Sequence, residues 1–276
     1  MTQPTVTFIG GGNMARAIYG GLLDNGFSAT NLSVVDPSAA AQDNARRAGI
    51  EHIFDSAPGE ALLADLIVLA IKPQITKAAL QPLAGQLGTH SLVLSIVAGI
   101  NAESLAALLG LSDTGHIIRC MPNTPALVGE GMTGLFASRE AGSAEGKALA
   151  ERVMSSVGQC VWVENESDLD VVTAISGSGP AYFFLFIESL TDAAIALGMN
   201  GESARKLALQ TALGASRLAS LSSEDAATLR KNVTSPGGTT EQAIQAFEAA
   251  DIRGIVAQAT QAAARRSLEL SKEFGA

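Results

Sequence analysis

The chain has 276 residues, 47% of them hydrophobic and 16% charged, so it can bury a large core, and its length favours two domains. A net charge of −9 argues against nucleic acid or an anionic membrane as partner, because both need an excess of Lys and Arg on some face. The chain opens without the segments of a secretion signal, and the apolar run at 66–71 is too short to span a bilayer, so we expect a cytoplasmic protein.

Short apolar runs alternate with helical segments from residue 5 to about residue 163. The alternation predicts βαβ units and a Rossmann-like, doubly wound, mostly parallel sheet, which makes the fold class α/β. We place this dinucleotide-binding domain at residues 1–164. The predicted strands cover 5–9, 31–36, 64–71, 91–99, 115–121, 132–138 and 159–163, and helices at 13–26 and 39–49 each end at a glycine.

The first predicted strand runs directly into the glycine loop GGGNMA. Gly10, Gly12 and Ala15 match the pattern G-x-G-x-x-A, in which glycines let the pyrophosphate approach the backbone at a helix N-terminus. The second strand ends in Asp36, at the distance expected for a ribose partner. Asp36 favours NADH, but Ser38 follows it, so the choice between NADPH and NADH stays open.

Three later segments stand at strand ends, where ligands lie in this architecture. They are LAIKPQ (69–74), IVAGI (96–100) and RCMPNTPA (119–126). For Lys72, a solvated cation at a strand end is an equally good interpretation. The predicted cofactor-binding residues are Ile9, Gly10, Gly12, Asn13, Met14, Ala15, Asp36, Ser38, Ala70, Ile71, Lys72, Pro73, Val97, Ala98, Gly99 and Asn123.

Strand signals vanish after residue 164, and the remainder predicts an all-α domain over 165–276. Helices are expected at 168–197, 202–221, 224–232, 240–249 and 252–274, with a bend at the glycines near Pro180. The segment AYFFLFIESLTDAAIALG is apolar around most of its circumference, so it needs cover on nearly all sides. We therefore expect this domain to pack against a second copy of itself.

Two adjacent glycines interrupt the helical domain in NVTSPGGTTEQAIQAF (232–247). One interpretation is a turn, with Thr239 and Gln242 forming a capping box for the next helix. The other is a loop with a functional role, for which the rest of the chain must be considered. The stretch alone leaves both open.

Five motifs occur in order over nearly the whole chain: FIGGGNMA, LAIKPQ, RCMPNTPA, ISGSGPAYFF and NVTSPGGTTEQAI. Together they resemble the pyrroline-5-carboxylate reductases. The resemblance implies hydride transfer from NADPH or NADH to the C=N bond of 1-pyrroline-5-carboxylate, giving L-proline in the last step of proline biosynthesis. It also implies a homodimer interlocked through the helical domains, often assembled further into a decamer.

The resemblance implies a substrate loop in the helical domain, usually supplied by the partner chain. The N–H groups of its Gly-Gly turn, Gly237 and Gly238, would form a cradle for the substrate carboxylate. In this loop, Thr240 would be the catalytic residue, hydrogen-bonded to the imine nitrogen. The implied substrate-binding residues are Ser235, Gly237, Gly238, Thr239 and Thr240, with Asn232 and Glu166 as neighbours.

Three alternative functions place different demands on these residues. A hydroxyacid dehydrogenase of the 3-hydroxyisobutyrate type needs a lysine base where Phe183 stands, and an apolar ring cannot accept a proton. A non-catalytic NAD(P) sensor would not need the carboxylate cradle. A reductase of a six-membered imine acid differs by one methylene and stays open.

No metal site is expected, because the sequence has no metal-ligand spacing. His52, His90 and His116 are expected to be surface or loop residues. Cys120 and Cys160, which lack disulfide or CxxC spacing, are expected to be core thiols in a reducing compartment.

Overall fold

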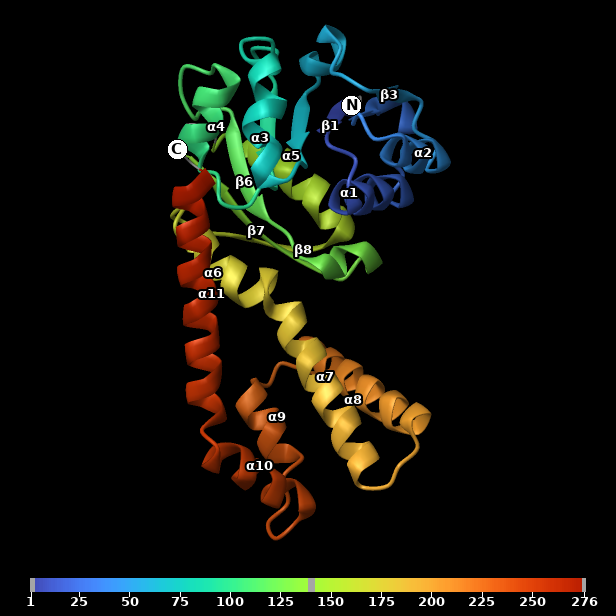
Figure 1. The fold of residues 1–276 in the computed structure, drawn as a ribbon, viewed down its shortest axis with the longest axis vertical. Helices are drawn as coiled ribbons and strands as arrows, with labels where there is room; N and C mark the ends of the chain where they lie inside the picture. The colour runs from blue at the N-terminus through green and yellow to red at the C-terminus, as the bar shows by residue number, and fades with distance from the viewer. Residues whose placement is uncertain (1–2, 139–141, 275–276) are drawn as a thin grey trace. The chain divides into compact units, whose positions relative to one another are not determined.

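The computed structural model describes residues 3–138 and 142–274, which form two compact units (Figure 1). Unit 1 consists of Met1–Ser178 and Ala263–Ala276, and unit 2 of Gly179–Ala262. The first boundary between the compact units follows Ser178, whereas the division predicted from the sequence follows residue 164. The helical residues 168–177 belong to unit 1, where Leu169 is buried and Val172 fills the space that a side chain at Gly134 would need.

Within the described residues, unit 1 is built on one sheet of eight strands. Its order is β3-β2-β1-β4-β5-β6-β7-β8, and the neighbours are parallel except for β6 and β7. The predicted mostly parallel sheet is confirmed. The strand β3 was missed, because it has three residues and begins at the exposed His52. The bounds are β1 (Val6–Ile9), β2 (Leu32–Val35), β3 (His52–Phe54), β4 (Leu66–Leu69), β5 (Leu92–Ser95), β6 (Ile117–Met121), β7 (Gly131–Ala137) and β8 (Gly158–Trp162).

Helices cover both faces of this sheet. The helices α1 (Asn13–Asp24), α2 (Ala39–Arg47) and α5 (Ala144–Met154) contribute to one core, and α3 (Pro73–Leu80) and α4 (Ala102–Leu109) contribute to the other. Successive residues of β4 alternate between them, with Leu66 and Val68 in the first core and Ile67 and Leu69 in the second. The strand is buried on both sides, as the continuous apolar run predicts.

Shorter helical segments connect these elements. They are η1 (Ala29–Asn31), η2 (Gly59–Leu63), η3 (Gln81–Leu83), η4 (Thr124–Val128), η5 (Ser155–Val157), α6 (Asp168–Val172) and the π-helical η6 (Thr173–Gly177).

Over its described residues, unit 2 consists of helices joined by loops and contains no strand. It contains α7 (Gly179–Ala196), α8 (Gly201–Leu221), α9 (Ala226–Asn232), α10 (Thr239–Ala249) and the first part of α11 (Ile252–Phe274), and α7 packs along α8 (Figure 1). The helical segment predicted over 168–197 is present, and the predicted bend lies after η6, at Ser178, whose N–H donates to the carbonyl of Thr173 at 2.7 Å.

Candidate functional site

The glycine loop joins β1 to α1 at the carboxyl edge of the sheet. Gly10 has a φ of +101°, and a Cβ there would overlap the carbonyl oxygen of Ala70. Gly12 has no atom within 4 Å of a built Cβ, so its side of the loop is open. The two glycines therefore serve different needs: Gly10 packs against the next strand end, and Gly12 leaves room for a ligand.

The first turn of α1 presents backbone donors. Gly12 is the N-cap and provides no side-chain hydrogen bond, and the first turn has no acidic residue. The N–H groups of the first turn, including those of Asn13 and Met14, are thus left to an anionic ligand. Ala15 is buried beneath the turn and brings the helix close to the sheet.

Asp36 joins the glycine loop to the end of β2. Its Oδ2 accepts from the N–H of Gly11 at 2.7 Å, and its Oδ1 accepts from the N–H of Ser38 at 2.8 Å. The carboxylate therefore fixes both the loop and the start of α2, in addition to any contact with a ribose.

The next strand ends line the same edge, because β2, β1, β4 and β5 are neighbouring parallel strands. Strands β2 and β3 are added on one side of β1, and β4 and the later strands are added on the other side. The point between β1 and β4, where this order of addition reverses, is the position where dinucleotides bind in this architecture. Ala70 and Ile71 lie against Gly10, and Lys72, which is exposed, and Pro73 begin α3. Ile9 ends β1 and is buried.

The turn after β5 is held by the C-terminal helix. Gly99 has a φ of +74°, and a Cβ there would lie 3.3 Å from the carbonyl of Leu270 in α11. Val97 is buried and Ala98 is half-buried. The predicted cofactor residues of the first five strands thus share one edge of the sheet, and their contact with a cofactor stays a prediction.

Asn123 has an internal role. Its Oδ1 accepts from the N–H of Met132 at 2.8 Å, and its Nδ2 donates to the carbonyl of Ser176 at 3.0 Å. It thereby ties the loop after β6 to β7 and to η6. A position beside the nicotinamide stays a prediction.

Glu166 lies in unit 1 and makes an ion pair that the sequence analysis did not anticipate. Its Oε1 accepts from Nη1 of Arg119 at 2.9 Å and from the N–H of Ala102, at the start of α4, at 2.7 Å. The Arg119 side chain is 12% exposed, and its Nε is buried without a hydrogen-bond partner. A lone cation in the otherwise apolar strand IIRCM was the signal that could have identified Arg119.

The substrate loop joins α9 to α10 in unit 2. The capping box is wrong: Gly238 is the N-cap without a side-chain bond, and Thr239 is the first helical residue. The N–H of Gly237, at a φ of +72°, donates to Oε2 of Glu241 at 2.8 Å, and the N–H of Gly238 donates to the carbonyl of Ser235 at 3.0 Å. Both glycine donors are therefore used inside the loop, and those at the start of α10 are left for an anion.

Asn232 ends α9, just before this loop. Its Nδ2 donates to Oε2 of Glu224 at 3.0 Å, a partner that the sequence analysis missed. Ser235 and Thr239 are exposed and Thr240 is half-buried. The loop residues predicted from the sequence thus form one continuous surface segment.

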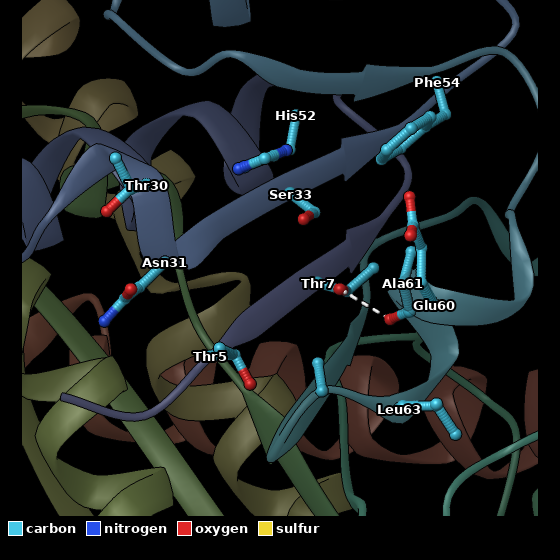
Figure 2. A pocket seen from close by; sticks show the side chains of 11 residues that line it. Thr5, Thr7, Thr30, Asn31, Ser33, His52, Phe54, Glu60, Ala61 and Leu63 are labelled. Carbon is cyan, nitrogen blue, oxygen red and sulfur yellow. Dashed lines mark hydrogen bonds between the residues drawn. The ribbon is translucent and has the colours of Figure 1, made fainter. Parts of the chain in front are cut away.

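A hydroxyl-lined hollow lies elsewhere on unit 1 (Figure 2). The residues that line it include Thr7 of β1, Ser33 of β2, His52 and Glu60. The Thr7 hydroxyl donates to the carbonyl of Ala61 at 2.7 Å. None of the predicted cofactor or substrate residues lines this hollow.

The cysteines are core thiols. Cys120 is buried, and burial is the main cause that raises its thiol pKa; burial also raises the pKa of the half-buried Cys160. Neither is a ready thiolate nucleophile. Across the described residues, no group of three His, Cys, Asp or Glu side chains could hold a metal ion.

Comparisons with known proteins cover the full chain. Residues 5–99 match the family "NADP oxidoreductase coenzyme F420-dependent", and residues 166–270 match "Pyrroline-5-carboxylate reductase dimerisation". A pyrroline-5-carboxylate reductase of Pseudomonas aeruginosa is 45% identical over 100% of both chains, and one of Vibrio alginolyticus is 42% identical over 99% of this chain and 100% of its own.

Solved structures agree with this result. A pyrroline-5-carboxylate reductase from Coxiella burnetii superposes with a TM-score of 0.90 at 40% identity, covering 98% of this chain and 99% of that one. A pyrroline carboxylate reductase from Plasmodium falciparum, solved with NADP bound, has a TM-score of 0.83 at 31% identity, with 98% and 99% covered.

Proposed function

The chain belongs to the pyrroline-5-carboxylate reductase family, and from that premise we propose how its residues divide the reaction. It is an NAD(P)H-dependent oxidoreductase that reduces the C=N bond of 1-pyrroline-5-carboxylate to give L-proline. The observation that carries this function is the match over 100% of both chains with the Pseudomonas relative, which spans the glycine loop and the substrate loop together. Unit 1 binds the dinucleotide, and unit 2 provides the loop that receives the imine acid.

The glycine loop fits a nicotinamide dinucleotide. Gly12 leaves open space, and the first turn of α1 offers backbone donors and contains no acidic residue. We assign the pyrophosphate to this turn and the adenosine ribose to the side of Asp36. When bound, the reduced nicotinamide supplies the hydride, and the residues of the protein supply position and fixed dipoles.

The substrate loop suits an acid with one carboxylate and one ring nitrogen. The first-turn N–H groups of α10, from Thr239 and Thr240, would bind the carboxylate without burying a cationic side chain. We assign the Thr240 hydroxyl to the imine nitrogen, where it would orient the C=N carbon toward the nicotinamide. Ser235 and Asn232 border this position. We assign Glu166 a structural role in unit 1, as the ion-pair partner of Arg119, in place of contact with the substrate.

A second copy of the chain would cover the apolar surface of unit 2. Phe183, Phe184 and Leu185 of α7 are 63%, 64% and 62% exposed in the single chain. The segment Asp168–Ala196 even has the length and composition of a membrane span, with 11% of the residues in its most apolar window buried. Because the dimerisation family covers this segment, we propose that its apolar face packs against the partner, in a cytoplasmic dimer that assembles into a decamer.

The reaction is tested by mixing the purified protein with 1-pyrroline-5-carboxylate and following the loss of reduced-nicotinamide absorbance, with NADPH and with NADH in parallel. Turnover is expected with at least one cofactor, and the two kcat/KM values give the preference. Thr240→Ala should lower kcat/KM by about a hundredfold if the hydroxyl orients the substrate. Unchanged kcat/KM would remove Thr240 from the catalytic role, and oxidation only with a six-membered imine acid would change the assigned ring size.

The oligomeric state is tested on the same preparation by light scattering. A mass twice that of the chain is expected for the dimer and ten times for the decamer. A stable monomer that retains full activity would contradict the interlocked arrangement.

A further inference from the structure

Glu241 is a loop residue to which the proposed reaction gives no role. It lies in the first turn of α10, is half-buried, and its Oε2 accepts from the N–H of Gly237 at 2.8 Å. The residue that it holds has a φ of +72°, the left-handed region in which glycine is favoured. The carboxylate therefore closes a ring across the two glycines, from the first turn of α10 back to the residue before its N-cap.

This hydrogen bond changes how the loop can receive a substrate. With the N–H of Gly237 bound to Glu241 and that of Gly238 bound to Ser235, neither glycine donor is available to an incoming carboxylate. The first-turn donors of Thr239 and Thr240 follow directly in sequence. An anion bound to them lies beside a fixed negative charge, because Glu241 is the next residue of the same turn.

We propose that Glu241 is a positioning residue of the substrate loop, which fixes the two-glycine turn and directs the substrate carboxylate to the N–H groups of Thr239 and Thr240. The inference rests on the proposed function of this loop. The charge of Glu241 has a second effect: it weakens the binding of the substrate and of the product, since both carry one carboxylate. The turn is thus rigid before substrate arrives and holds its anion loosely.

The alternative is that Glu241 only stabilises the helix. An acidic residue in a first turn interacts favourably with the helix dipole, and a carboxylate three residues after an N-cap commonly bonds back to the backbone. That role alone changes the unfolding temperature and leaves the kinetic constants unchanged. The two accounts therefore differ in KM and kcat.

The test uses the full-length protein in three variants. Glu241→Gln keeps an oxygen that can accept from Gly237 and removes the charge, whereas Glu241→Ala removes both. Glu202→Gln, in the exposed first turn of α8, is the matched control for loss of a charge near a helix N-terminus. Circular dichroism and binding of NADPH or NADH, which belongs to unit 1, establish that each variant is folded.

For Glu241→Gln we expect the KM for 1-pyrroline-5-carboxylate to fall by roughly two- to fivefold with kcat nearly unchanged, as for one partly screened like-charge pair. The difference from wild type should shrink as salt is raised. For Glu241→Ala we expect kcat to fall by about tenfold, because Thr240 loses its fixed position. Glu202→Gln should leave both constants unchanged.

Two results would overturn the proposal. Wild-type values of KM and kcat in both Glu241 variants, with only a lower unfolding temperature, would leave the helix-stabilising role alone. A KM that rises in Glu241→Gln would show that the charge does not oppose the substrate. If the wild type itself fails to turn over the imine acid while it binds the dinucleotide, the proposed function is wrong, and the inference falls with it.

Discussion

Replacement of Gly10 by alanine tests how the glycine loop is built. An L-residue at a φ of +101° costs about 1–3 kcal/mol. The added Cβ would also overlap the carbonyl oxygen of Ala70 and lie 2.9 Å from Cγ2 of Ile71, and overpacking of this kind costs about a further 1–3 kcal/mol. The sum, about 2–6 kcal/mol, is a large part of the stability of an ordinary domain.

Gly12→Ala is the matched control for this substitution. Its φ of −67° suits alanine, and no atom lies within 4 Å of the new Cβ. We expect a loss of only about 0.5–1 kcal/mol, because alanine is a poor N-cap. The methyl group instead enters the space assigned to the pyrophosphate and should weaken dinucleotide binding about tenfold, which is about 1.4 kcal/mol.

The assay pairs urea unfolding with fluorescence titration of NADPH and NADH for both variants. Gly10→Ala should lower the unfolding midpoint strongly, whereas Gly12→Ala should chiefly lower affinity. If Gly10→Ala unfolds at the wild-type urea concentration, the packing against Ala70 does not fix the loop. If Gly12→Ala binds as well as wild type, the pyrophosphate does not occupy that side.

Three further predictions concern other contacts of unit 1. Asp36→Ala should raise the ratio of kcat/KM with NADPH to kcat/KM with NADH. The binding of both cofactors should weaken, because the N–H of Gly11 loses its acceptor. An unchanged ratio would exclude Asp36 from the choice of cofactor. Glu166→Ala should cost about 1–3 kcal/mol in urea unfolding by leaving the mostly buried Arg119 unpaired, and a smaller loss in the Arg119→Met background would identify the ion pair as the cause. Burial raises the folded-state pKa of Cys120, so its contribution to stability is full below the ordinary thiol pKa of about 8.5 and is lost as pH rises above it. Urea unfolding at pH 7 and pH 9.5 should show this loss in wild type and a smaller loss in Cys120→Ala, which keeps Cys160, whose pKa burial also raises. An equal loss in both proteins would exclude Cys120 as its source.

Local patterns predicted most of the fold. Apolar runs and glycine stops gave the long strands and helices, and Gly26 and Gly49, which end the first two predicted helices, both have positive φ. What the sequence did not reveal depends on contacts between distant residues. One such contact is the bond of Asn123 to Ser176, which ties the π-helical η6 to the loop after β6. Another is the pair of Arg119 with Glu166, which joins β6 to a segment far along the chain. In neither pair does the hydrophobic periodicity of one segment indicate which distant residue it contacts.

The helices of the two ligand loops, α1 and α10, share a glycine N-cap. The helices α2 and α3 also lack a side-chain cap, but they begin at Ser38 and Lys72. The helices α4, α5, α8 and α9 begin at Asn101, Ser143, Asn200 and Asp225, whose side chains accept from the first turn. In contrast, α1 and α10 begin at glycines without such a bond. A glycine in place of a capping side chain costs a helix little and leaves its first donors for an external anion.

The two glycine-capped helices differ in turn, and the difference fits the anions assigned to them. In both loops a carboxylate holds the N–H of the glycine before the N-cap, but at α1 that carboxylate is Asp36, at the end of β2, and the first turn of α1 itself has no acidic residue. The first turn of α10 contains Glu241, which already holds one donor of its loop. An acid with a single carboxylate must leave after each turnover, and a neighbouring negative charge favours that departure. The two loops therefore use the same backbone device and differ in where its carboxylate stands, which at α10 is the turn that would bind the anion.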